Sequence, residues 1–188
     1  SLLQNAEHPR PDIAVVYLNR VTDAQEEKGR NAFIESYRRY RPALAHQFYV
    51  VNKGFAPEHL PIQYELFSEF APRFIQVTDE GYDLTAYQTA AAFIEEPVVL
   101  FLNTYSEPLH EGWLEKLHDA FRSPGVGLAE LAKPRDVHQS IGPTGFMIET
   151  ERFRRLAASP QLTGQGEAHR FEEGLASLTR MVEAEKLT

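Results

Sequence analysis

Three loops of the chain carry polar side chains of the kinds that bind sugars and nucleotides. Each loop follows an apolar segment expected to be a strand, and the loops cover residues 19–23, 79–83 and 103–107. The second loop contains Asp79 and Asp83, whose carboxylates can accept hydrogen bonds from sugar hydroxyls or from a nucleobase. A second explanation also fits, in which Asp83 caps a helix starting at Leu84 and Asp79 fixes the turn. The two roles can coexist.

The pattern of elements around these loops predicts an α/β domain. Strands are expected over 13–18, 47–51, 73–77, 97–102, 125–129 and 144–148. Helices are expected over 26–40, 57–70 (interrupted at Pro61), 84–94, 110–121, 151–157 and 171–185. Such alternation calls for a mostly parallel sheet with right-handed crossovers and helices on both faces. Because parallel strands share a carboxyl edge, the three loops are expected to converge on one crevice.

Composition excludes several classes of function. The chain has 188 residues, which is most simply one domain, with 1–11 as a loose lead-in and the domain over 12–188. Its net charge of −8 argues against a nucleic-acid partner, because phosphate backbones need a basic surface. No run reaches the roughly 20 apolar residues of a membrane span. The absence of cysteine excludes disulfides and Cys-based zinc sites, and it fits a reducing, cytoplasmic location.

Familiar nucleotide-binding and hydrolase motifs are missing. No G-x-x-x-x-G-K-[ST] loop is present, and no G-x-G-x-x-G follows the first expected strand. No G-x-S-x-G is found, and the seven histidines form no H-E-x-x-H pattern. These absences argue against P-loop, dinucleotide-binding and α/β-hydrolase chemistry.

Four blocks of sequence, in this order and spacing, resemble family 2 glycosyltransferases. They are Asp79-x-Gly-Tyr-Asp-Leu-Thr-Ala-Tyr87, Phe101-Leu-Asn-Thr-Tyr-Ser, Gly112-Trp-Leu-x-Lys-Leu and Pro124-Gly-Val-Gly-Leu128. Within that family the chain is most similar to bacterial glycosyltransferase-like proteins of surface-polysaccharide synthesis. The resemblance spans about residues 12 to 182. It implies a GT-A fold, with a nucleotide-sugar half over 12–109 and an acceptor half over 110–188.

The resemblance also implies an activity and a set of site residues. The activity is transfer of a sugar, of the hexosyltransferase type and with inversion, from a nucleotide-diphospho-sugar to a glycan or lipid-linked glycan. The implied donor-binding residues are Tyr17, Asn19, Arg20, Asp79, Asp83, Asn103, Tyr105 and Arg180. Glu172 or Glu173 is the implied general base, because an inverting transfer needs a base at the acceptor hydroxyl. The alternative for Glu172, Glu173 and Arg180 is a solvated helix start.

One substitution separates the chain from this family. Active members usually carry Asp-x-Asp after the fourth strand, where the pair holds Mg²⁺ or Mn²⁺ on the donor diphosphate. Here the residues are Asn103-Thr104-Tyr105, and none supplies an anionic oxygen at neutral pH. We therefore expect weak binding of a divalent cation, and we assign no residue as a metal ligand.

Three explanations of this substitution stay open. Glu107 or Asp79 replaces the missing ligand; or cations such as Arg20 or Arg180 neutralise the diphosphate; or the domain is a non-catalytic module that binds a glycan or a partner. A nucleotidyltransferase-like protein is a further reading. It predicts a glycine-rich phosphate loop after the first strand, which residues 19–22 do not supply.

Overall fold

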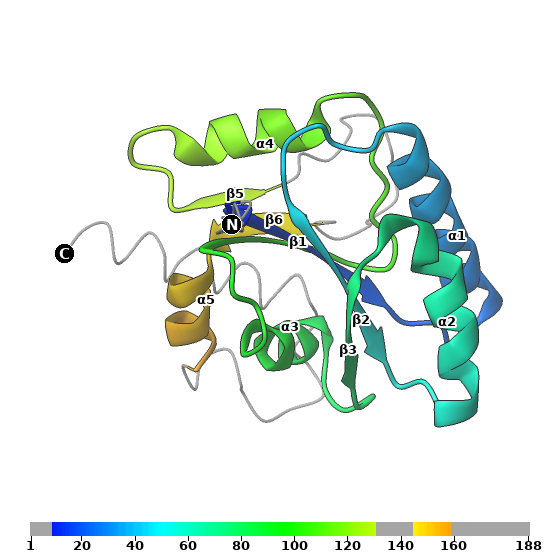
Figure 1. Ribbon diagram of the computed structural model, residues 1–188. Coiled ribbons are helices and arrows are strands. Elements are labelled where there is room, and N and C mark those ends of the chain that lie inside the picture. The colour runs from blue at the N-terminus through cyan, green and yellow to red at the C-terminus, as the bar shows by residue number, and fades with distance from the viewer. Residues whose placement is uncertain (1–8, 131–144, 159–188) are drawn as a thin grey trace, which may run out of the picture.

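The protein is built on one six-stranded sheet with the strand order β3-β2-β1-β4-β6-β5 (Figure 1). The computed structural model describes residues 9–130 and 145–158. Its strands are β1 (Ile13–Asn19), β2 (Gln47–Lys53), β3 (Arg73–Val77), β4 (Val98–Leu102), β5 (Leu128–Glu130) and β6 (Gly145–Glu149). The first four are parallel, whereas β6 runs antiparallel to both β4 and β5. The predicted α/β class with a mostly parallel sheet is confirmed.

Helices cover both faces of the sheet (Figure 1). They are α1 (Ala24–Arg39), α2 (Leu60–Phe67), α3 (Asp83–Ala91), α4 (Trp113–Arg122) and α5 (Thr150–Ala157), with short 3₁₀ turns η1 (Pro57–His59) and η2 (Ser68–Phe70). Side chains of α1, α2 and α4 form one apolar core with the sheet, and those of α3 and α5 form a second core on the other face.

The central strand β1 shows why the sequence contains a continuous apolar run. All seven of its residues are buried, and the six apolar ones before Asn19 alternate between the two cores. Val16 and Leu18 face α3 and α5, whereas Val15 and Tyr17 face the α1 side. A strand that is covered on both faces needs apolar side chains at every position rather than at every second one.

Two predictions on element boundaries are corrected. Pro61 does not interrupt a helix, because it lies in the first turn of α2, where its missing N–H has no helical partner to lose. The helix expected from residue 26 begins at Ala24, since the Asp23 carboxylate accepts the backbone N–H groups of Gln25 and Glu26.

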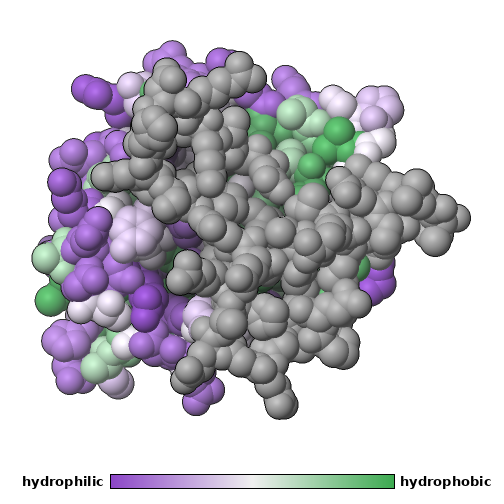
Figure 2. Space-filling model, turned by 180° about the vertical axis from the view of Figure 1, so that it is seen from behind, coloured by the Kyte–Doolittle hydropathy of each residue, from purple (hydrophilic) through white to green (hydrophobic). Residues whose placement is uncertain are grey.

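Part of the second half lies outside the described residues. The helix expected over 171–185, and with it Glu172, Glu173 and Arg180, belongs to that part. Within residues 9–130 and 145–158, no helix is long and apolar enough to cross a membrane. In the view from behind, the exposed side chains on the left are mostly hydrophilic, and apolar ones gather toward the upper right (Figure 2).

Candidate functional site

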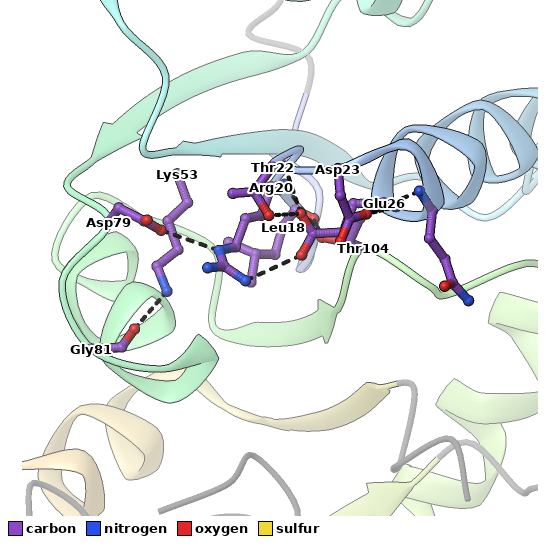
Figure 3. Close-up of polar contacts among 10 residues, drawn as sticks. Leu18, Arg20, Thr22, Asp23, Glu26, Lys53, Asp79, Gly81 and Thr104 are labelled. Carbon is purple, nitrogen blue, oxygen red and sulfur yellow. Dashed lines mark hydrogen bonds and ion pairs between the residues drawn. The ribbon is translucent and has the colours of Figure 1, made fainter. Parts of the chain in front are cut away.

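The carboxyl edge of the parallel strands brings the three predicted loops together. Asn19 at the end of β1 is in register with Asn52 of β2, and the ends of β3 and β4 lie beside these strands. Arg20 joins the loops, because its Nε lies 3.1 Å from Asp79 Oδ1 and its backbone N lies 3.3 Å from Thr104 Oγ1 (Figure 3). The three loops that were expected to converge are therefore joined at this edge of the sheet.

The Arg20 guanidinium also contacts helix α1. Its Nη1 lies 3.1 Å from Glu26 Oε1, and Glu26 Oε2 accepts bonds of 2.6 Å from both the backbone N and the hydroxyl of Thr22. The Glu26 side chain is 9% exposed, whereas that of Arg20 is 35% exposed. The sequence analysis did not select Glu26 as a site residue. Glu26 lies three residues after the helix cap Asp23, a position from which a glutamate side chain typically reaches back to the start of the helix.

Lys53 is a second cation at this edge that the sequence analysis did not select. It ends β2, is almost fully buried, and donates from Nζ to the carbonyl oxygen of Gly81 at 2.7 Å (Figure 3). Burial lowers the pKa of Lys53, while the nearby Asp83 carboxylate acts in the opposite direction. Burial likewise raises the pKa of Asp83, and the charges of Lys53 and Arg20 oppose that shift.

The capping explanation of Asp83 is wrong in its details. Helix α3 begins at Asp83 itself, and the residue in the capping position is Tyr82, whose side chain makes no cap bond. An acidic residue in the first turn still interacts favourably with the helix dipole. Asp79 makes an ion pair with Arg20 through Oδ1, and its side chain is half exposed.

Two predicted donor-binding residues lie beneath the edge rather than on it. Tyr17 is fully buried, stacks on Phe33 with ring centroids 3.9 Å apart, and donates its hydroxyl to the carbonyl of Thr104 at 2.8 Å. Burial raises the pKa of Tyr17 well above its usual value, so the phenol stays a donor. Asn19 is also fully buried, and its Nδ2 donates to Asn52 Oδ1 and Gln63 Oε1, both at 2.9 Å. Tyr17 and Asn19 therefore support the carboxyl edge of the sheet from within the core.

The end of β4 does not fit a divalent cation. Asn103 Oδ1 accepts from the backbone N of Tyr105 at 3.0 Å and from Ser106 Oγ at 3.2 Å. Thr104 Oγ1 donates to the carbonyl of Leu18 at 2.8 Å, so both side-chain oxygens are turned into the protein. Among the residues that the structure describes, no group of three His, Asp or Glu side chains is arranged to hold a metal ion.

Tyr105 is the predicted residue of this loop that reaches the surface. It is 43% exposed, and its ring lies over Gly29 of α1, where an added Cβ would approach the ring to 3.1 Å. Asn103, by contrast, is buried and shapes the turn that presents Tyr105. Of the predicted residues at this edge, Arg20, Asp79, Asp83 and Tyr105 are at least partly exposed.

Comparison with known proteins defines the class of fold. No protein-family model and no curated protein sequence matches the chain. Among solved structures, 4-diphosphocytidyl-2C-methyl-D-erythritol synthase from Anaerococcus prevotii aligns with a TM-score of 0.61 and 9% identity, over 92% of this chain and 83% of that one. The chain therefore has the α/β fold of nucleotidyl- and glycosyltransferases, as the following likenesses also indicate.

Two further solved structures share this fold with the chain. Residues 1–349 of TarS from S. aureus align with a TM-score of 0.58 and 14% identity, over 88% of this chain and 54% of that one. The mannosyltransferase PcManGT from Pyrobaculum calidifontis, in complex with GDP-Man and Mn²⁺, aligns with a TM-score of 0.55 and 15% identity, over 78% and 47%. The chain spans about half the length of these two. At such identities the likeness establishes the GT-A-like fold alone.

Proposed function

We propose that the chain is a GT-A-like glycosyltransferase domain, of the family 2 and hexosyltransferase type, that acts in the cytoplasm in bacterial polysaccharide assembly. It transfers a sugar with inversion from a nucleotide-diphospho-sugar to a glycan or lipid-linked glycan acceptor. The donor binds the half over 12–109, and the acceptor binds the half over 110–188. The observation that supports this most is the junction of three loops through Arg20 at the carboxyl edge of a GT-A-like sheet.

Each exposed group of the edge has a role in this proposal. Asp79 and Asp83 accept hydrogen bonds from the base or the ribose, because carboxylates are strong acceptors for hydroxyl and ring N–H donors. The Arg20 fork binds phosphate oxygens. The exposed face of the Tyr105 ring stacks on the base or the sugar. Tyr17, Asn19 and Asn103 hold these groups in place from beneath.

The reacting groups of the acceptor half complete the proposal. Glu172 or Glu173 accepts the proton of the acceptor hydroxyl as its oxygen forms a bond to the anomeric carbon. The bond from that carbon to the donor phosphate breaks, and the nucleoside diphosphate leaves with the electron pair. Arg180 adds positive charge beside the leaving group. In this mechanism Glu172→Gln or Glu173→Gln removes turnover and leaves donor affinity unchanged.

A donor panel tests the proposal. Calorimetry of the chain with UDP-, GDP-, dTDP- and CDP-linked sugars, in parallel with release of free nucleotide in the presence of glycan acceptors, should identify at least one donor. Asp79→Asn should then weaken binding of that donor several-fold. Glu80→Gln changes a neighbouring exposed carboxylate in the same loop and is the matched control. If no member of the panel binds or turns over, the proposal is wrong.

Two other functions are each favoured by one observation. The missing Asp-x-Asp favours a non-catalytic module that binds a glycan or a partner, and turnover that disappears with Glu172→Gln or Glu173→Gln would eliminate it. The likeness to the Anaerococcus prevotii synthase favours nucleotidyl transfer. That activity would release pyrophosphate from CTP or UTP. The residues after β1 form no glycine-rich loop, which weighs against it.

A further inference from the structure

At the end of β4, Asn103-Thr104-Tyr105 replaces the Asp-x-Asp pair that holds the metal in family 2 glycosyltransferases. The positively charged side chain of Arg20 lies next to this segment. Arg20 binds Thr104, the middle residue of the substituted motif, through its backbone N. Its side chain lies between Asp79, in the loop that follows β3, and Glu26 on α1. These two carboxylates are therefore already paired with a cation that belongs to the chain.

The Arg20 guanidinium has donors left for a ligand. A guanidinium carries five N–H donors, of which those on Nε and Nη1 meet Asp79 and Glu26 in the described part of the chain. The remaining N–H groups extend from a side chain that is 35% exposed. The planar fork of arginine matches two oxygens of a phosphate, and its charge does not depend on pH in the range where proteins fold.

The side chains of Asp79 and Asn103 are poorly placed to hold a divalent cation at this edge. Asp79 is held by Arg20, so a divalent cation recruited by Asp79 would have to lie beside the guanidinium and be repelled by it. The Asn103 amide oxygen already accepts two hydrogen bonds from its own loop. Lys53 adds a second positive charge nearby, where it holds the loop of Asp79 and Asp83 through the Gly81 carbonyl.

From this arrangement we infer that the edge binds the diphosphate of a nucleotide with Arg20 as its cation and without a divalent metal ion. The inference rests on the proposed function for the nature of the ligand, and it specifies how the charge of that ligand is neutralised. The two anionic partners of Arg20 position the guanidinium, and a phosphate takes the N–H groups that they leave.

Binding of nucleoside diphosphates to the intact chain tests the inference. UDP, GDP, CDP and dTDP are titrated by calorimetry in EDTA and, separately, in Mn²⁺ or Mg²⁺. At least one should bind in EDTA with a dissociation constant within about threefold of its value with metal. Arg20→Met should weaken that binding about tenfold or more, the order of one charge-assisted contact, and should weaken binding of the matching nucleoside much less.

Arg38→Met is the matched control, because Arg38 is also an exposed arginine paired with a carboxylate, Glu69, and lies at the opposite end of α1. It should bind the nucleotide as the unmodified chain does. Binding that appears only with metal overturns the inference and leaves the proposed function standing. Unchanged binding by a folded Arg20→Met chain also overturns it. Absence of binding under every condition overturns both. The comparison of EDTA with metal decides the matter even if Arg20→Met fails to fold.

Discussion

The two edges of the sheet both hold buried charged groups, but they differ in what those groups can still bind. Near the amino edge, the carboxylate of Glu96 is 6% exposed and accepts the Tyr49 hydroxyl at 2.8 and 3.3 Å from its two oxygens. At the carboxyl edge, Arg20 is held by two carboxylates and is still one-third exposed. The first charge is enclosed by protein, and the second also faces solvent.

This difference shows that a buried charge does not by itself mark a binding site. Glu96 is as buried as Glu26, and both accept hydroxyl groups of neighbouring side chains. Glu26, however, supports an exposed cation at a point where three loops meet, whereas Glu96 closes a contact within the fold. The edges should therefore respond in opposite ways to substitution, with ligand affinity changing at one and stability at the other.

The largest effect is expected from Gly81→Ala at the carboxyl edge. Gly81 has φ +68°, and an added Cβ would approach Thr85 Oγ1 to 2.6 Å, so the loop must shift. The shift moves the carbonyl that Lys53 binds, and with it Asp79 and Asp83. We expect about a tenfold loss of nucleotide affinity by calorimetry and a cost of about 2 kcal/mol by urea unfolding.

Gly112→Ala is the control for backbone strain alone. Gly112 has the similar φ of +73°, but no atom of the residues described by the structure lies within 4 Å of an added Cβ. It should cost about 1 kcal/mol and leave nucleotide affinity unchanged. Equal losses of affinity in both variants would show that the loop of Asp79 and Asp83 has no special part in binding.

At the amino edge, Tyr49→Phe should reduce stability and leave binding unchanged. The substitution removes the donor of a buried carboxylate, for which a cost of about 2 kcal/mol in the free energy of unfolding is expected. The dissociation constant of the best nucleoside diphosphate should stay within twofold. A clear loss of affinity in a chain that remains folded would contradict the division of roles between the edges.

A smaller effect separates the exposed from the buried tyrosine of the carboxyl edge. Tyr105→Ala removes an exposed ring and should weaken nucleotide binding about three- to tenfold, the usual scale of one stacking contact, with little change in stability. Tyr17→Phe removes only the bond to the Thr104 carbonyl and should cost about 1 kcal/mol of stability, with a change in affinity below twofold. The reverse result would restore Tyr17 as a group that touches the ligand.

Sequence periodicity was sufficient for most of the fold, because a doubly covered sheet imposes a strong pattern. The continuous apolar runs located the parallel strands, and β3 was predicted with its observed bounds. The convergence of the three loops followed from parallel pairing alone. Helix boundaries were harder to predict from the sequence. Pro61 is compatible with either a break in a helix or the first turn of one, and only the observed start of α2 decides between them.

The site was predicted less completely, since its contacts depend on packing between distant segments. Glu26, Lys53 and Gln63 appear in the sequence as ordinary members of a helix start, a strand end and a helix. The importance of Lys53 and Gln63 comes from neighbours far away in the chain, Gly81 and Asn19, and that of Glu26 comes from Arg20, six residues before it. Conversely, the family resemblance implied ligand contacts for Tyr17 and Asn19, but the strand β1 is covered so fully that both are enclosed.

The smallest effect is expected at alkaline pH, and it distinguishes the enclosed edge from the open one. Burial, followed by the neighbouring Glu96 carboxylate, raises the pKa of Tyr49 from 10.0 to about 12. In that window the unfolded chain releases a proton that the folded chain keeps, so the free energy of unfolding falls as pH rises from about 10 to about 12. Below pH 10 the phenol is protonated in both states, and its contribution is fully present.

Tyr49→Phe should therefore flatten the dependence of stability on pH in this window. Urea unfolding at several pH values between about 9 and about 11.5 measures the slopes, with the offset between the two proteins at neutral pH subtracted. Other buried tyrosines, such as Tyr37, keep their share of the slope in both proteins, because burial also raises the pKa of Tyr37. Parallel curves would mean that the Tyr49 phenol is not enclosed with Glu96, and the contrast between the edges would then rest on exposure alone.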